Sequence, residues 1–165
     1  FGHSNIIQYE HRPFADVNEM DKALIANWNS VVGKHDTVFV LGDISFYGHE
    51  KTEHLVRQLR GTKHLVKGNH DAKGPRWWMD VGFETASRYP IILDEYLVLQ
   101  HKPPEYYNEA SPYFYLYGHV HGAEAYQTLT KKSCCVCVER WKYTPVSFDQ
   151  ITAELSKLEI AQRTK

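Results

Sequence analysis

Four short apolar runs in this chain each end in residues that can bind a metal ion. The residues that follow these runs are Gly42-Asp43, Gly68-Asn69-His70-Asp71, Gln100-His101 and Gly118-His119-Val120-His121. An apolar run that stops at a glycine or a polar residue is typical of a buried strand entering a loop at the edge of a sheet. Four such strands would bring carboxylate, amide and imidazole groups to one rim, which is how a divalent metal site is built.

Length and charge limit the classes of protein to which the chain can belong. Its 165 residues fit one domain with a core of its own, and 42% hydrophobic with 24% charged residues is ordinary for a globular protein. The 19 basic and 20 acidic side chains give no overall attraction to nucleic acid or to an anionic membrane. No apolar run is long enough to cross a bilayer. We therefore expect a single domain over residues 1–165, with no strong nucleic-acid signal and no membrane segment.

The three cysteines lie close together in one alternating run, Cys134, Cys135 and Cys137. An odd number at this spacing does not form a disulfide framework, and a thiolate metal site would need a second ligand pair that the sequence lacks. We predict small apolar residues on a strand, in a reducing compartment. With no signal-peptide pattern in the sequence, we expect a cytoplasmic location.

The first half of the chain alternates helix and strand patterns. Residues 1–13 read as a loop, and Asn18 is expected to cap a helix that ends at Gly33. A strand over 36–41, a helix over 49–60 and a strand over 62–67 follow. This alternation predicts parallel strands joined by crossover helices.

The second half has few helix signals. Short strand-like runs cover 83–88, 90–93, 96–101, 113–117, 125–130 and 133–138, which predicts a mixed or antiparallel sheet. A last helix is expected to begin near Ser147, with Ile151, Leu155 and Leu158 on one face.

Taken in order, the four loop sequences resemble four of the five motifs of the calcineurin-like metallophosphoesterases. The two ends of the chain, Phe1 to Ile6 and Trp141 to Ser147, resemble those of small bacterial and phage members of that family. The resemblance thus covers nearly the whole chain. It implies an α/β fold, namely an α/β/β/α sandwich of two mixed sheets flanked by helices.

The resemblance also implies roles for individual residues. Asp43 would bridge two divalent metal ions. Asn69, His101 and His119 would complete the second site, and His121 would join Asp43 at the first. Oxygen and nitrogen ligands suit manganese, iron, nickel and zinc alike. Of these four metals, we expect manganese to support activity in an assay.

His70 would bind no metal and would act on the substrate as a general acid or transition-state stabiliser. The implied reaction is hydrolysis of a phosphate monoester or diester by a metal-activated hydroxide. The substrate is expected to be small or nucleotide-like, and Trp77, Trp78 and several tyrosines could stack a base, although core packing explains most of them. A non-catalytic scaffold that binds a partner protein is the alternative, but such proteins typically lose this histidine.

One family motif, Asp-x-His at the end of a first strand, is missing from this sequence. In the members that this chain resembles, it falls immediately before Phe-Gly-His, and here those three residues open the chain. We expect the motif and its strand to lie upstream of Phe1. His3 could be a neighbour of the site or a substrate contact, and Asp71 could orient His70 or cap its loop. Five further histidines, His11, His35, His49, His54 and His64, are expected to be structural or surface residues.

Overall fold

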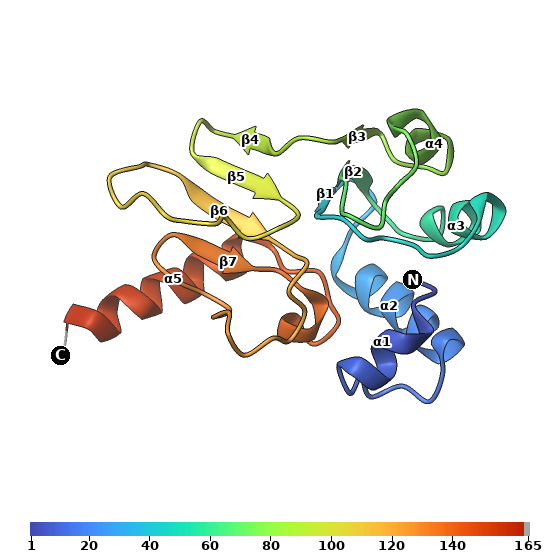
Figure 1. The fold of residues 1–165 in the computed structure, drawn as a ribbon, viewed down its shortest axis with the longest axis horizontal. Coiled ribbons are helices and arrows are strands. Elements are labelled where there is room, and N and C mark those ends of the chain that lie inside the picture. The colour runs from blue at the N-terminus through green and yellow to red at the C-terminus, as the bar shows by residue number, and fades with distance from the viewer. Residues whose placement is uncertain (164–165) are drawn as a thin grey trace.

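The computed structural model describes residues 1–163, which form two β-sheets with flanking helices (Figure 1). The first sheet consists of three parallel strands, β1 (Thr37–Val40), β2 (Thr62–Val66) and β3 (Thr85–Ser87), in that order. The second has the order β4 (Ile91–Leu93), β5 (Leu97–Gln100), β6 (Phe114–Tyr117) and β7 (Ser133–Cys135). Its β4–β5 pair is antiparallel and the other two pairs are parallel. The predicted mixed α/β fold is confirmed, with parallel pairing in the first half and a mixed sheet in the second.

The helices lie outside the two sheets. They are α1 (Ser4–Tyr9), α2 (Val17–Val31), α3 (His49–Val56), α4 (Pro75–Asp80), the 3₁₀ helix η1 (Val138–Trp141) and α5 (Phe148–Arg163). Helices α3 and α4 cover one face of the first sheet, where Val56 and Trp78 pack against Leu65. Burial of such side chains, each stabilising by roughly 1.5–3 kcal/mol, fixes these helices on the sheet.

A second core joins the two sheets and α5. Its buried members are Leu41, Val66, Leu97, Leu99, Leu116, Cys134 and Ile151. Neighbouring residues on β2 separate the two cores, because Leu65 faces the α3 and α4 side while Val66 faces this one. Ser147 caps α5 by accepting a hydrogen bond from the Gln150 amide at 3.1 Å, close to the predicted start. Packing between the sheets holds the ends of β1, β2, β5 and β6 together.

Two predictions near the N-terminus are wrong. The expected loop over residues 1–13 contains α1, which the side chain of His3 caps by accepting a hydrogen bond from the Ile6 amide at 3.3 Å. A helix of six residues is too short to show a periodic apolar pattern. Asp16, and not Asn18, caps α2, because its carboxylate accepts from the amides of Asn18 and Glu19 at 2.8 and 2.9 Å.

Three further segments differ from the prediction. Helix α3 ends at Val56, before the expected residue 60, because the chain turns to enter β2. The run over 125–130 forms no strand among the described residues and contributes one isolated bridge, Leu129 to Cys134. The run over 133–138 leaves the sheet after Cys135 and continues as η1.

Among the described residues, no helix combines the length and apolar character that a membrane span requires.

Candidate metal centre

The candidate ligands follow the carboxyl ends of strands from both sheets. Asp43 comes after β1, Asn69 after β2, His101 directly after β5 and His119 after β6. In open parallel sheets, functional side chains gather at this end of the strands. Packing of the two sheets therefore brings together residues that are far apart in the sequence.

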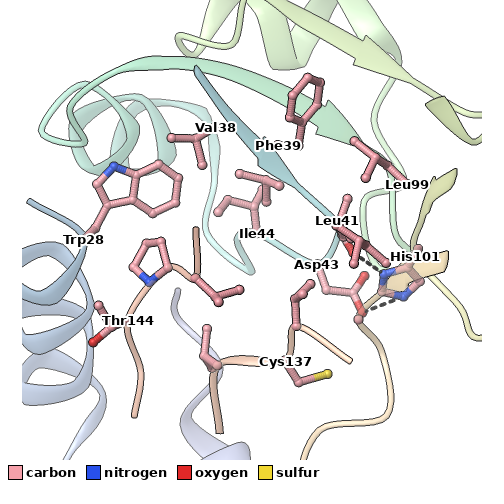
Figure 2. Close-up of a pocket in the computed structure, with 18 of the residues that line it drawn as sticks. Trp28, Val38, Phe39, Leu41, Asp43, Ile44, Leu99, His101, Cys137 and Thr144 are labelled. Carbon is pink, nitrogen blue, oxygen red and sulfur yellow. Dashed lines mark hydrogen bonds and ion pairs between the residues drawn. The ribbon is translucent and has the colours of Figure 1, made fainter. Parts of the chain in front are cut away.

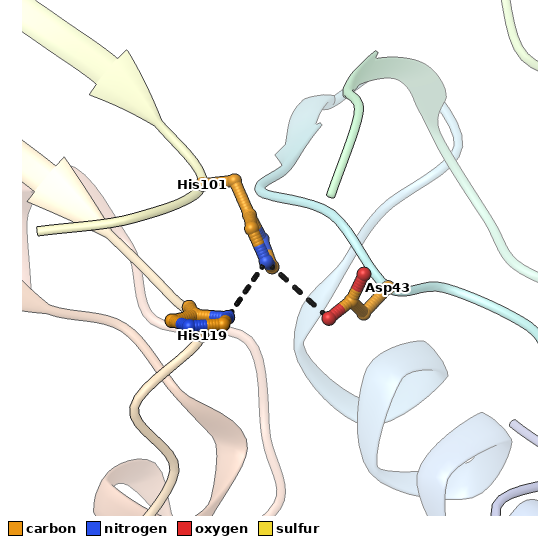
Figure 3. A group of neighbouring side chains, drawn as sticks. All are labelled: Asp43, His101 and His119. Carbon is orange, nitrogen blue, oxygen red and sulfur yellow. Dashed lines mark hydrogen bonds and ion pairs between the residues drawn. The ribbon is translucent and has the colours of Figure 1, made fainter. Parts of the chain in front are cut away.

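The Nε2 atom of His101 lies at the centre of the cluster. Its distances are 3.3 Å to Asp43 Oδ2, 2.9 Å to Asn69 Oδ1 and 3.1 Å to His119 Nδ1. Figure 3 shows the two rings and the carboxylate converging on one point. Asp43, His101 and His119 each offer a ligand atom within 4.8 Å of the other two. The structure thus gathers all four residues predicted for the second metal site.

The hydrogen bonds of His101 indicate that this arrangement suits a cation. Its Nδ1 donates to the Leu41 carbonyl oxygen at 2.7 Å. In the neutral ring Nε2 then carries a lone pair, although the oxygens of Asp43 and Asn69 both point at it. A single proton on Nε2 could satisfy only one of them, whereas a divalent ion accepts nitrogen and oxygen ligands together. The residues present therefore fit a divalent metal ion.

Two glycines permit the close approach of the ligand loops. A Cβ atom on Gly68 would clash with the backbone and carboxylate of Asp43, and one on Gly42 would clash with His101 and with Gly68. Gly42 also has φ +91°, a conformation that side chains rarely allow. Asp43 and His119 have left-handed backbones as well, with φ 55° and 69°. Such strain in non-glycine residues is concentrated at functional sites.

Asp71 holds the loop of His70 against that of Asp43. Its buried carboxylate accepts from the amides of Asp43 and Gly68 at 2.7 and 2.8 Å, and from Ile44 at 3.3 Å. The His70 amide in turn donates to Asp43 Oδ1 at 2.8 Å. The side chain of Asp71 therefore binds backbone groups of both loops, and the backbone of His70 is fixed to a candidate ligand.

His121 lies outside the group formed by Asp43, His101 and His119. Its Nδ1 is 3.0 Å from Oε1 of Glu139, which also accepts from Arg12 Nε at 3.1 Å. The predictions from sequence missed Glu139 and Arg12, since 127 residues separate them and neither belongs to a motif. The only available signal was the position of an acidic residue just after the run of cysteines.

Electrostatic interactions couple these groups. Burial would raise the pKa of Asp43, but the interaction of its carboxylate with the His101 ring and the hydrogen bond from the His70 amide outweigh burial and lower this pKa. Burial likewise opposes charge on His101, whose pKa the Asp43 carboxylate nevertheless raises. Burial and the neighbouring His101 lower the pKa of His119. Asp43 is thus kept ionised and His119 neutral, the states in which both bind metals.

The centre opens into a cavity of about 790 Å³ that runs along the unpaired edge of β1. Figure 2 shows Asp43 and His101 at one end of this cavity and Trp28 and Thr144 at the other. The expected upstream strand with its Asp-x-His motif stays a prediction. His3 also lines the cavity, where its ring packs against Phe46 with centroids 4.3 Å apart.

Fold and site together define an α/β protein with a candidate metal centre. The calcineurin-like phosphoesterase family matches residues 10–161, so the chain belongs to this family. Its members hydrolyse phosphoesters with divalent metal ions.

Two of the similar proteins match most of the chain, and a third matches less than half of it. It is 34% identical to the uncharacterized protein MJ1445 of Methanocaldococcus jannaschii over 95% of this chain and 87% of that protein. The Gene 66 protein of Mycobacterium phage L5 is 39% identical to this chain over a segment that covers 45% of this chain and 37% of the phage protein. The crystal structure of a protein of unknown function from Aquifex aeolicus, AQ665, has a TM-score of 0.65 and 23% identity, covering 96% of this chain and 94% of that one. This last similarity supports the fold alone.

Proposed function

We propose that the chain hydrolyses small phosphodiesters, including nucleotide-like ones, with a dinuclear metal centre. The observation that carries this proposal is the convergence of Asp43, Asn69 and His119 on Nε2 of His101. These four residues would hold one ion, while Asp43 and His121 would contribute to the other. Divalent ions held there would supply an activated water molecule and would offset charge on the phosphoryl group. Manganese is the metal that we propose for assays.

His70 is the proposed general acid. Its backbone is fixed to Asp43, yet its side chain is exposed beside the centre. A histidine in this position can give a proton to the leaving oxygen and then recover it from solvent. Metal binding alone would not require such a residue.

A hollow of about 230 Å³ beside His70 supports a substrate with a planar group. Phe46 and Trp77 line it together with His70 and Lys73. Phe46 is 43% exposed, and its ring centroid lies 5.1 Å from that of His70. Aromatic side chains stack on bases without regard to their sequence. A nucleobase or aryl group attached to the leaving oxygen could bind in this hollow.

We also propose a cytoplasmic location for the protein. Its three cysteines are free, which agrees with a reducing compartment.

The test is hydrolysis of an aryl phosphodiester and of the matching monoester, with manganese, iron, nickel or zinc added in turn. We expect turnover of the diester with manganese, and its loss in His70→Ala. A protein that binds metal but turns over neither ester with any of the four would contradict the proposal and favour the non-catalytic scaffold. Faster turnover of the monoester would correct the substrate class alone.

A further inference from the structure

One short segment after β7 contacts His121 at three points. Cys137 Sγ accepts from the His121 amide at 3.2 Å, Glu139 Oε1 lies 3.0 Å from its Nδ1, and Arg140 Nε donates to its carbonyl oxygen at 3.0 Å. The backbone of His121 has φ 49°, which non-glycine residues seldom adopt. Both backbone polar groups and the ring of His121 are thus held in a conformation that it would not favour alone.

Arg12 holds Glu139 in place from a distant part of the chain. Its Nε and Nη2 both donate to Glu139 Oε1, and each of the two side chains is only 8% exposed. A guanidinium group fixes the position of a carboxylate more firmly than a lysine does, because its donors lie in a rigid plane. The carboxylate that faces His121 therefore has little freedom to move.

The pairing of Glu139 is unusual for a purely structural ion pair. Arg12 and His121 both bind Oε1, while the buried Oε2 has no hydrogen-bond partner within residues 1–163. A forked pairing with one donor group on each oxygen would satisfy both atoms. A buried polar atom without a partner is costly, so stability alone does not explain this geometry. Glu139 and His121 also line the cavity that contains Asp43.

The carboxylate determines which nitrogen of His121 carries the proton. An ionised carboxylate only accepts hydrogen bonds, so in the neutral ring Nδ1 must be protonated and Nε2 must carry the lone pair. His101 follows the same rule with a different acceptor, since its Nδ1 donates to the Leu41 carbonyl oxygen. A histidine that binds a metal commonly has such an acceptor on its other nitrogen.

We propose that Glu139, held by Arg12, is a positioning residue that fixes the tautomer and orientation of His121 and leaves Nε2 free to bind the metal ion shared with Asp43. This inference rests on the proposed function, which assigns His121 to that ion. Glu139 itself acts through the histidine and does not touch the substrate. It therefore adds a carboxylate and its arginine to the residues on which the first metal site depends.

The first test reads the tautomer in the metal-free full-length protein by ¹⁵N NMR of the histidine rings. We expect His121 to be protonated on Nδ1 in the wild type, and to become a mixture of tautomers in Glu139→Ala and Glu139→Leu, neither of which offers an oxygen acceptor. If Glu139→Ala does not fold, Glu139→Leu, which keeps most of the side-chain volume without an acceptor, provides the comparison. Glu154→Gln, which removes an exposed carboxylate paired with Lys157, is the matched control. An unchanged His121 tautomer in a folded Glu139 variant would overturn the inference.

The second test is manganese titration of Glu139→Gln, His121→Ala and the double variant. We expect Glu139→Gln to lower the affinity for one of two manganese ions by about 10- to 100-fold. In the His121→Ala background, the same change should have no further effect on affinity. Equal losses in both backgrounds would show that Glu139 acts independently of His121. If His121→Ala weakens manganese binding and Glu139→Gln does not, this inference fails and the proposed function stands. If His121→Ala has no effect either, both fail.

Discussion

The Nε2 atom of His101 lies 3.3 Å from Oδ2 of Asp43, although the two residues follow strands of different sheets. His101 comes directly after β5, and Asp43 comes shortly after β1. The same ring donates from Nδ1 to the carbonyl oxygen of Leu41 at 2.7 Å. The candidate metal centre therefore depends on the packing of the two sheets, and metal binding and sheet packing should stabilise each other.

Asp43→Ala should remove both metal ions, because Asp43 is the one residue that both proposed ligand sets share. Elemental analysis of purified protein gives the number of ions per chain. Asp36→Ala is the control, since Asp36 is exposed and caps the turn before β1 through the Gly33 amide. A variant that keeps two tightly bound ions would show that Asp43 does not bridge them.

His70→Ala should lower kcat by about 10²- to 10⁴-fold, the usual contribution of a positioned acid or base. The number of bound metal ions should stay the same, because the hydrogen bond from His70 to a candidate ligand comes from its backbone amide and not from its ring. Steady-state kinetics with manganese and elemental analysis provide the two readouts. His35→Ala, at an exposed site before β1, is the control. Loss of the metals together with activity would mean that His70 is itself a ligand.

The positions of several strands and the proximity of most candidate ligands were predictable because they depend on local patterns. Each apolar run ended at a glycine or polar residue, and parallel pairing then placed Asp43 and Asn69 at the same edge of one sheet. The six residues of α1 were not predictable, because their single buried residue, Ile6, gives no period. The 125–130 run failed for a different reason. Its alternation is real, but the chain pairs there at one bridge only.

The contacts of His121 could not be predicted from local patterns. Arg12 and Glu139 lie 127 residues apart, and their pairing follows from the packing of the turn after α1 against η1. No spacing rule reports such a contact. By contrast, His101 and His119 were predicted as ligands, and the structure brings their ring nitrogens to 3.1 Å. Their metal-binding roles stay predictions.

The cysteines should affect stability and not metal content. Cys134 and Cys135 are completely buried, so replacing both by Ala should cost about 1 kcal/mol or more in the free energy of unfolding through lost packing. Cys137→Ser keeps an acceptor for the His121 amide and completes the triple variant. Urea unfolding and elemental analysis are the measurements. Loss of one ion per chain would contradict the prediction that these thiols bind no metal.

Gly68→Ala should disrupt the metal centre. The added methyl group would meet both the backbone nitrogen and the carboxylate of Asp43, neither of which can move without breaking the hydrogen bonds to Asp71 and His70. We expect loss of manganese binding with a lower melting temperature. Gly74→Ala is the matched control in the same loop, because nothing lies within 4 Å of its added methyl. Equal manganese affinity in the two variants would show that the close approach of the loops is not required.

The stability of the metal-free protein should depend on the ionisation of Glu139. Burial would raise its pKa, but His121 and Arg12 lower it from 4.5 to about 2. Between these values the unfolded chain binds more protons than the folded one, so this contribution is complete above pH 4.5 and is lost as the pH falls toward 2. The difference corresponds to about 3 kcal/mol.

Glu139→Gln removes the titrating carboxylate, so the variant should be less stable at neutral pH and lose less stability on acidification. His121 does not affect this slope, because its pKa is raised from 6.5 and it is protonated in both states below pH 4.5. The measurement is the free energy of urea unfolding of wild type and variant over the pH range from about 5 to 2. Parallel curves for the two proteins would mean that Glu139 titrates alike in the folded and unfolded states. The ion pair with Arg12 would then contribute no pH-dependent stability, and Glu139 would be held by packing instead of by charge.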